Sequence, residues 1–497
     1  AGRTDRALTA AAGTARLLLG RTVDLASADG HDSADLPAAA ALLRQAASCA
    51  EAAAAWLRGE DDVPDTDRMA AALVQFRAAR AAVAPDGLPP ERLRLGALAL
   101  SLGEWTTSMV AAIRIAAGAP VGPDPTPESA QPGLFWFAYR RTPWLWWHRL
   151  REHLTPRSVY FQGALRLATA LALARLLAGV FDLSHGFWVL LTILTVLRAS
   201  AAETRSALRP ALVGTVLGSL VAAGLLVIGV PPTAYAVLLP VVMVVGFAAG
   251  PLLGPGWAQA LFTLVIALVF AQVSPVDWRL AEARVVDVLV GAAVGVLIGL
   301  LAWPRGGSGE LHRATGRFLA TSAGVVRETV AVVAEGLPVG HAQPAAREAG
   351  LLAEASYALY QSERHEPGAL DWQSTLIAGH HAVRGSEALV RACPSGGLLP
   401  CVGSLRAAAA DVAARYERVA DGLLTHDHAL VRDRLPDPPA AEWPTDLGQD
   451  LYHLADLRVW LDGLREDLGR VVGPPGAALD PADLRTRVAR VADGDVG

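Results

Sequence analysis

The sequence predicts an all-α protein in which a six-helix transmembrane bundle is flanked by helical cytoplasmic domains. Three observations support this prediction. The 497 residues are 53% hydrophobic, and the apolar residues are concentrated in a central block, 160–303. Within that block, long apolar segments are separated only by short turns. On both sides of it, apolar residues recur at helical spacing, and no alternation typical of strands stands out.

The central block, which we place within a transmembrane domain spanning residues 159–305, contains six apolar segments. They are Phe161–Gly179, Gly186–Leu197, Leu208–Ile228, Ala234–Phe247, Trp257–Val273 and Val285–Trp303. A spanning helix needs roughly 20 mostly apolar residues. The second and fourth segments reach that length only by including flanking residues, such as 181–185 and 231–235. Because lipid offers the backbone no water, each segment is predicted to be a helix.

Residues 1–118 are predicted to form a helical cytoplasmic domain without a site of its own. Apolar residues at helical spacing indicate about four helices. They are expected over Arg6–Ala26, from HDSADLP through Trp56, from Asp65 to Val83, and from Pro89 to Ala116. Proline in the first turn of the fourth is typical of a helix start.

Residues 119–158 are predicted to be a linker followed by an interfacial helix. Residues 119–133 are rich in Pro and Gly, which is typical of a linker. The residues that follow include four tryptophans and five arginines: Trp136, Trp144, Trp146, Trp147, Arg140, Arg141, Arg149, Arg151 and Arg157. Trp prefers the headgroup level, and Arg is attracted to anionic lipid. We expect this helix to lie on the membrane before the first span; a soluble helix with a Trp-rich face is the alternative.

Arginine placement predicts that both termini are cytoplasmic. The segment before the first span is strongly basic, Arg198, Arg205 and Arg209 follow the second span, and Arg305 follows the sixth. The turns after the first and third spans carry no arginine, so the positive-inside rule places them outside. The loop 274–284 disagrees in part, because it should face outside and yet carries two arginines beside two acidic residues.

Residues 306–497 are predicted to form a second helical cytoplasmic domain. Helices are expected at about Gly309–Glu335, Ala345–Glu363, Asp371–Ala392, Gly403–Leu424, Leu447–Val472 and Pro481–Val491. His365, His380 and His381 have no metal-ligand spacing and are expected at the surface. The three cysteines indicate neither a disulfide framework nor a zinc site.

Charged residues within the apolar segments need an explanation, because burying a charge in hydrocarbon is expensive. Arg166 lies near the cytoplasmic end of the first span, where extension to the headgroups and a functional role are equally reasonable. Arg175 is deeper and is expected to face the bundle interior, a partner carboxylate or a wet cavity. Asp287 is a candidate partner for Arg175 and a candidate proton-coupling group; alternatively, it pairs with Arg284, three residues earlier.

Two further positions are candidates for contact with a substrate. His185, in an outer turn, can titrate near neutral pH, or it can simply cap the second helix. Arg198, at the end of the second span, can be a positive-inside anchor or can meet anionic substrates at the inner mouth.

Glycines at intervals of four mark close helix packing. Gly214 and Gly218 lie one turn apart in the third span, and Gly291, Gly295 and Gly299 form a stripe in the sixth. Small residues at this spacing let helix backbones approach closely.

The sequence lacks the P-loop, GxSxG, HExxH and kinase motifs. We therefore expect neither an enzyme nor a cofactor or metal site, and any pumping must use an ion gradient or another protein. The net charge of −5 argues against a nucleic-acid partner.

The central stretch resembles the fusaric acid resistance-like family of aromatic acid exporters. The similarity runs through ALRLATALALARLLAG, then HGFWVLLTILTVLRASAAETRSALRPALVGTVLGSL, then ARVVDVLVGAAVGVLIGLLAWP. The second segment is the most specific and includes His185, Trp188 and Arg198. The resemblance implies a bacterial inner-membrane location and a transport role, in which His185, Trp188, Arg175 and Arg198 meet the substrate.

Members of that family commonly consist of two halves, each with a membrane block and a cytoplasmic helical domain. The chain begins with Ala1 rather than Met, and it resembles the end of a first half followed by a complete second half. We therefore expect the natural protein to start upstream. The resemblance implies that a transport path needs a homo-oligomer or an upstream transmembrane half.

Three hypotheses follow from the sequence. The first is an exporter of small organic, aromatic anions that is coupled to an ion gradient. The second is a dimeric anion channel similar to plant aluminium-activated malate transporters, in which the same arginines line a pore without coupling. The third is a membrane scaffold that transports nothing and whose cytoplasmic domains bind a partner.

Overall fold

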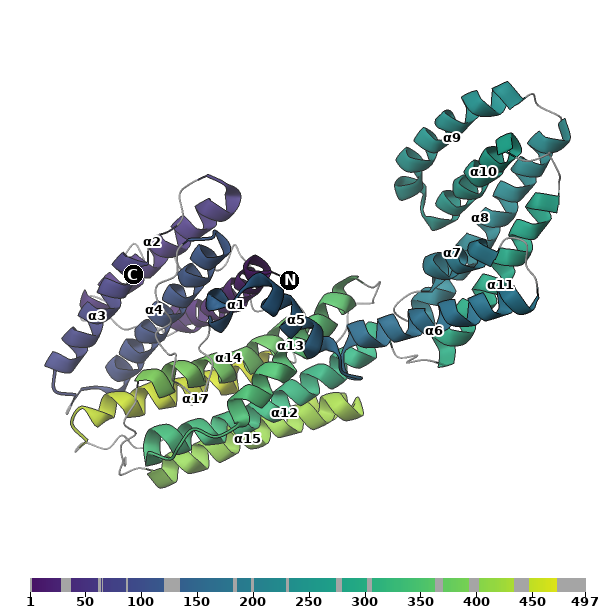
Figure 1. The fold of residues 1–497 in the computed structure, drawn as a ribbon. Coiled ribbons are helices and arrows are strands. Elements are labelled where there is room, and N and C mark those ends of the chain that lie inside the picture. Colours follow the sequence, from purple (N-terminus) through teal and green to yellow (C-terminus); the bar gives the residue numbers. More distant parts are fainter. Residues whose placement is uncertain are drawn as a thin grey trace. The chain divides into compact units, whose positions relative to one another are not determined.

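The computed structural model describes most of the chain. The described residues are 2–27, 37–60, 64, 66–85, 88–119, 135–181, 186–197, 201–228, 232–273, 279–301, 306–362, 370–392, 402–432 and 447–471. Within these ranges the protein is all-helical, with seventeen α-helices, one short 3-10 helix and no strand (Figure 1). The all-α prediction is therefore confirmed for the described residues.

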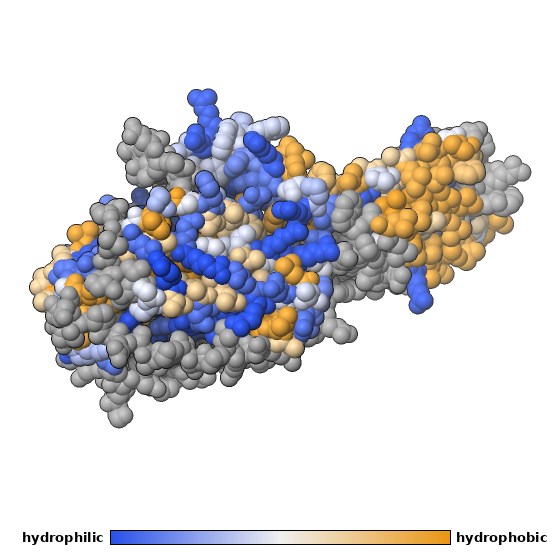
Figure 2. All heavy atoms as spheres, turned by 90° about the horizontal axis from the view of Figure 1, so that it is seen from below, coloured by the Kyte–Doolittle hydropathy of each residue, from blue (hydrophilic) through white to orange (hydrophobic). Residues whose placement is uncertain are grey.

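The chain divides into two compact units. The first unit comprises Ala1–Leu154, His312–Glu354 and His365–Gly497; the second comprises Thr155–Leu311 and Ala355–Arg364. The two polar segments, which lie on opposite sides of the apolar block in the sequence, thus belong to one unit. Apolar side chains dominate the visible surface of the second unit, whereas the first displays many hydrophilic ones (Figure 2).

The first unit is a helical assembly of twelve described elements. Its elements are α1 (Arg3–Ser27), α2 (Pro37–Arg58), α3 (Asp67–Ala82), α4 (Pro90–Ala116), η2 (Trp136–Tyr139), α5 (Thr142–His153), α12 (Gly306–Glu335), α13 (Ala342–Ser362), α14 (Trp372–Ala392), α15 (Val402–Thr425), α16 (His428–Arg432) and α17 (Asp450–Arg470). The first residues of α12 and the last of α13 belong to the second unit.

Helix α4 is central because it is apolar on nearly every side. It contacts α1, α2, α3 and α17, and its buried residues include Leu93, Trp105 and Ile113. Most of these helices match their expected bounds to within three residues; the segment expected near Pro481–Val491 lies outside the described residues.

The second unit contains the six helices that the apolar segments predict. They are α6 (Val159–Val180), α7 (Gly186–Val196), α8 (Ala201–Ile228), α9 (Pro232–Leu253), α10 (Pro255–Val273) and α11 (Arg279–Leu301). One apolar core joins α6, α7 and α11, and includes Ala170, Val189 and Val294. Another joins α9 and α10 with α8, and includes Tyr235 and Leu268. Contacts between α8 and α11 connect the two groups.

Two described segments are long and apolar enough to cross a membrane, Val159–Val180 and Leu208–Leu225. Three shorter apolar segments lie in α9, α10 and α11. The prediction of six spans is therefore supported only in part. The eleven residues of α7 cover about 16 Å at 1.5 Å each, about half of a hydrocarbon core. The residues needed to lengthen it, 182–185, lie outside the described ranges.

Candidate functional site

Asp287 is buried in the second unit, with 3% of its surface exposed. Four residues later on α11, a side chain at Gly291 would meet Val189 and Thr192 of α7, and one at Gly295 would approach Val196. The contacts advance in the same direction along both helices, so α7 and α11 run parallel. Because residues four apart share a helix face, Asp287 faces the beginning of α7.

Trp188 occupies that beginning of α7 and is buried, with 4% exposed. The Thr192 hydroxyl donates a hydrogen bond to the Trp188 carbonyl oxygen at 2.9 Å. The last turn of α6 is also close, since a side chain at Gly186 would meet Ala178 at 2.7 Å. The packing thus brings Asp287 and Trp188 to one end of the α6, α7 and α11 group.

The two arginines of α6 have environments different from those we expected. Arg175 is exposed, so the expectation that it faces the bundle interior is wrong. Arg166, for which extension to the headgroups was one option, is 4% exposed. The reason is helical periodicity. Arg166 shares a face with the buried Ala170, Ala174 and Ala178, at intervals of four.

Arg175 follows Ala174 and is therefore turned about 100° away from that buried face. Its next neighbour, Leu176, is 62% exposed. Arg175 consequently does not join Asp287 inside the unit. The regular run of alanines was visible in the sequence, and it was the signal by which Arg166, not Arg175, could have been selected as the buried arginine.

Two of the predicted substrate-contacting residues, His185 and Arg198, lie outside the described residues. Arg284 belongs to α11, but its side chain is not described. The remaining predicted positions are the glycines, and four of the five have described surroundings.

The close-packing glycines hold two different helix pairs together. A side chain at Gly214 or Gly218 of α8 would collide with backbone oxygens of α10, those of Gly256 and Ala260 respectively. On α11, a side chain at Gly291 would meet the Val189 oxygen at 2.8 Å, whereas Gly295 has 3.8 Å to Val196. Gly299 is buried. The close approaches of α8 to α10 and of α11 to α7 therefore require glycine, which has no side chain, at these contacts.

A buried charged cluster lies in the first unit, where the sequence predicted no site. His381 was expected at the surface, and this is wrong, because it is 2% exposed. Its Nδ1 lies 2.7 Å from Asp467 Oδ2 on α17 and 2.9 Å from Arg21 Nη2 on α1. Since the Asp467 carboxylate only accepts hydrogen bonds and is the nearer partner, we infer that Nδ1 carries a hydrogen and donates a hydrogen bond to Asp467 Oδ2.

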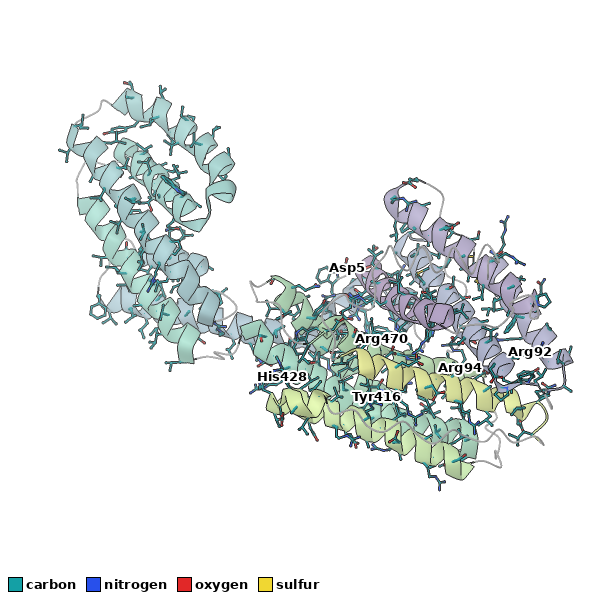
Figure 3. All side chains as sticks on the ribbon, turned by 180° about the vertical axis from the view of Figure 1, so that it is seen from behind. Asp5, Arg92, Arg94, Tyr416, His428 and Arg470 are labelled. Atoms are coloured by element: carbon teal, nitrogen blue, oxygen red, sulfur yellow. The ribbon has the colours of Figure 1, made fainter. Side chains whose placement is uncertain are left out.

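Arg21 completes this cluster, which joins α1, α14 and α17. It lies 3.3 Å from Asp467 and 3.7 Å from Glu466, and Arg470 lies 3.0 Å from the other Asp467 oxygen. Burial by itself raises the pKa of the Asp467 carboxyl. Arg21 and the hydrogen bond from His381 outweigh that effect, and the pKa is lowered. Asp467 is therefore an ionised carboxylate at neutral pH. Figure 3 places Arg470 on α17 and Tyr416 on α15.

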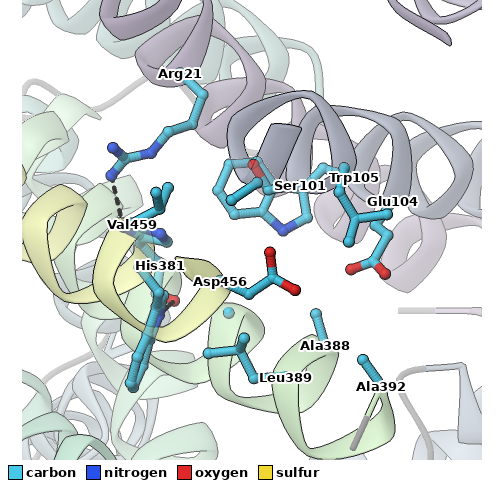
Figure 4. A pocket seen from close by; sticks show the side chains of 14 residues that line it. Arg21, Ser101, Glu104, Trp105, His381, Ala388, Leu389, Ala392, Asp456 and Val459 are labelled. Carbon is cyan, nitrogen blue, oxygen red and sulfur yellow. Dashed lines mark hydrogen bonds between the residues drawn. The ribbon is translucent and has the colours of Figure 1, made fainter. Parts of the chain in front are cut away.

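A cavity of about 50 Å³ lies beside this cluster, between α1, α4, α14 and α17. Figure 4 shows the Asp456 and Glu104 carboxylates and the indole nitrogen of Trp105 directed toward it. Asp456 accepts two hydrogen bonds from Arg80, at 2.8 and 3.1 Å. Burial raises the pKa of Glu104 despite its contact with Arg77. By volume the cavity holds only a few water molecules.

No metal-binding group of His, Cys, Asp and Glu is found among the described residues. The arrangement in the first unit is therefore a buried ion-pair network around a small cavity. In the second unit, the Asp287 carboxylate and the Trp188 indole are buried near the last turn of α6, whereas the buried Arg166 lies twelve residues before Ala178 of that turn, about 18 Å along the helix.

Comparison with known proteins finds similarity within the second unit. A family model described as fusaric acid resistance protein-like matches residues 170–298. The inner membrane protein YccS of Escherichia coli (strain K12) is 31% identical over 159 residues, which are 32% of this chain and 22% of that relative. The chain thus spans about a fifth of the length of this relative.

The match confirms the resemblance drawn from the sequence: residues 170–298 are similar to the fusaric acid resistance protein-like family. The matched range contains Arg175, Trp188 and Asp287 together with the glycines up to Gly295. It excludes Arg166, which lies four residues before it, and Gly299.

Proposed function

We propose that this chain is part of an inner-membrane exporter of small organic anions, aromatic acids among them, and that export is coupled to an ion gradient. The observation that carries the proposal is Asp287, a carboxylate with 3% of its surface exposed inside a segment that matches the fusaric acid resistance-like family. Burying a carboxylate in an apolar segment costs free energy, and carboxylates found in such segments mark functional sites. Proton uptake and release by Asp287 is the coupling step we assign to it.

Arg166 is the better candidate for recognising the anion inside one copy of the chain. It is buried on the same helix face that packs against α7 and α11, whereas Arg175 is exposed. Arginine suits this role because its charge persists at every physiological pH and its planar donors match a carboxylate. Arg175 can take part where a second copy, or another transmembrane block, covers the exposed face of α6.

The proposal is tested by transport into proteoliposomes that contain the full chain. A panel of aromatic and aliphatic carboxylates is supplied at equal concentration on both sides, and a pH gradient is imposed. We expect net accumulation of at least one aromatic acid, and loss of that accumulation when a protonophore is added. If no anion accumulates at equal concentrations but flux does occur down a separately imposed substrate gradient and ignores the protonophore, the protein is instead an anion channel. Absence of flux for every anion would leave the scaffold hypothesis.

Asp287→Asn separates coupling from conduction. We expect this variant to lose gradient-driven accumulation while exchange of labelled substrate across the membrane continues, because the amide cannot carry the proton. The measurement is accumulation against exchange in the same vesicles. Fully proton-dependent accumulation by the variant would remove Asp287 from the coupling role.

A further inference from the structure

Helix α5 is fixed to the first unit along one side. Leu145 is fully buried against Ala7, Ile115 and neighbouring aromatic residues. Arg6 of α1 donates a hydrogen bond to Glu152 of α5 at 3.0 Å, and its guanidinium lies 5.2 Å from the Trp136 ring centre. The helix therefore has a defined inner face and a defined outer face.

The outer face of α5 carries several large apolar side chains that are exposed. Trp146 and Trp147 are 56% and 61% exposed, and Leu150 and Leu154 are 52% and 55% exposed. Trp144, at 43%, stacks on His148 with ring centres 4.8 Å apart. Exposing several large apolar side chains together is costly in water and marks an interaction surface.

The same face is positively charged. Arg140, Arg141 and Arg151 are exposed, whereas Arg149, four residues after the buried Leu145, lies on the inner side. The segment has one carboxylate, Glu152, which is already held by Arg6. Large indole rings combined with excess arginine are the composition that suits the headgroup region of an anionic bilayer. A purely apolar protein partner would not explain the charge, and a nucleic acid would not explain the leucines.

We propose that this outer face, Trp144, Trp146, Trp147, Leu150 and Leu154 with the surrounding arginines, binds the anionic phospholipid surface of the membrane. Continuity of the chain supports this occupant. Only five residues separate the end of α5 from Val159, where a helix long and apolar enough to cross a membrane begins. The tryptophans enter the headgroup layer and the arginines contact lipid phosphates. The proposal does not depend on transport activity.

The first experiment measures where residue 147 lies. A spin label is attached at Trp147→Cys in the full chain, with the three native cysteines replaced, and the chain is inserted into nanodiscs of phosphatidylcholine and phosphatidylglycerol. We expect the label to collide more with oxygen, which concentrates in lipid, than with a water-soluble nickel chelate. A label at Val74→Cys, on α3 and equally exposed at 63%, is the matched control and should show the reverse preference.

Two results would overturn the proposal. Accessibility at residue 147 that resembles residue 74 would place the face in water. Protection from both oxygen and the nickel chelate would place it against protein instead. Because both labelled side chains are exposed, neither substitution removes a core contact, and the folded state should be retained.

The second experiment tests the charge. The full chain in a neutral detergent is titrated with phosphatidylglycerol, and the lipid concentration that gives half of the maximal thermal stabilisation is measured. Removing an arginine near an anionic surface weakens binding about fivefold, so Arg141→Gln with Arg151→Gln should raise this concentration about 25-fold. Arg44→Gln with Arg68→Gln, also exposed but on α2 and α3, should leave it unchanged. An equal rise of this lipid concentration in both double variants would contradict a lipid-phosphate contact on α5.

Discussion

His380 and His381 are consecutive residues of α14, and they face different neighbours. Adjacent positions on a helix are turned by about 100°. His380 therefore reaches Glu354 on α13 at 2.9 Å and remains partly exposed, whereas His381 reaches Asp467 on α17 and is buried. Each histidine is matched by a carboxylate that is distant in the sequence. At this scale, burial depends on partners from other helices.

Replacing Asp467 should strongly destabilise the first unit. Asp467→Asn removes the anion and leaves Arg21, with a side chain 5% exposed, as a buried charge without its main counterion. Breaking such a pair from one side costs about 3–5 kcal/mol. The measurement is unfolding of the full chain in detergent, with intrinsic fluorescence as the signal.

The matched control is Asp462→Asn on the same helix. Asp462 also pairs with an arginine, Arg465, at 3.1 Å, but its side chain is 45% exposed. Asp462→Asn should lower the free energy of unfolding by less than about 1 kcal/mol. Equal effects of the two substitutions would mean that the cluster around His381 contributes no more than a surface ion pair.

The Asp467 cluster also predicts how stability depends on pH. Because the folded-state pKa of Asp467 is lowered below its ordinary value of 3.8, its contribution is fully present above that value. It is lost as the pH falls through the folded-state pKa, since the unfolded chain binds the proton first. The difference in Tm between wild type and Asp467→Asn should be constant near neutral pH and should narrow below 3.8. A difference that does not change with acidification would contradict this assignment.

At the scale of the helix pair, two glycines of one motif differ in how closely they approach the neighbouring helix. Gly291 and Gly295 belong to the same four-residue repeat on α11, and both are buried. Only Gly291 touches the backbone of α7, while Gly295 leaves room for a methyl group. The repeat therefore marks the helix face that packs, but the tight contact is at one residue.

Gly291→Ala and Gly295→Ala should therefore change stability in opposite directions. At Gly291 the new methyl group overlaps the Val189 oxygen and the Thr192 side chain, and overpacking of this kind costs about 1–3 kcal/mol. At Gly295 the methyl fits, and alanine is favoured over glycine within a helix by up to about 1 kcal/mol. Thermal unfolding in one detergent compares them. A loss of Tm of similar size in both would show that the register of α7 on α11 differs from the one described.

At the scale of the whole molecule, the exposed face of α6 needs a partner if Arg175 serves transport. Arg175 is exposed beside Leu176 and Val180, which are 62% and 68% exposed. An arginine that faces only lipid carries a cost, which extension to the headgroups reduces. A second copy of the chain covering this face would bring two such arginines together at a shared surface.

A cysteine crosslink can test for that second copy. In a background with the native cysteines replaced, Leu176→Cys should form a disulfide-linked dimer under mild oxidation in membranes. Val237→Cys on α9, which is 72% exposed, is the control and should remain monomeric. If Leu176→Cys also remains monomeric, a second copy does not cover this face, and Arg175 has no role in a homodimeric path.

The sequence by itself determined the helical class, the position of nearly every described helix and the family resemblance. These features depend on local periodicity, apolar composition and short motifs. The sequence also identified Asp287 and the packing glycines as unusual, because a charged residue or a glycine can be recognised from its identity alone. Only the tertiary structure decided that the alanine face of α6, with Arg166, packs against other helices, that His381 is buried beside Asp467, and that the two polar segments share one unit. Those properties depend on which face of each helix meets a neighbour, and the neighbours are brought together by contacts between residues hundreds of positions apart.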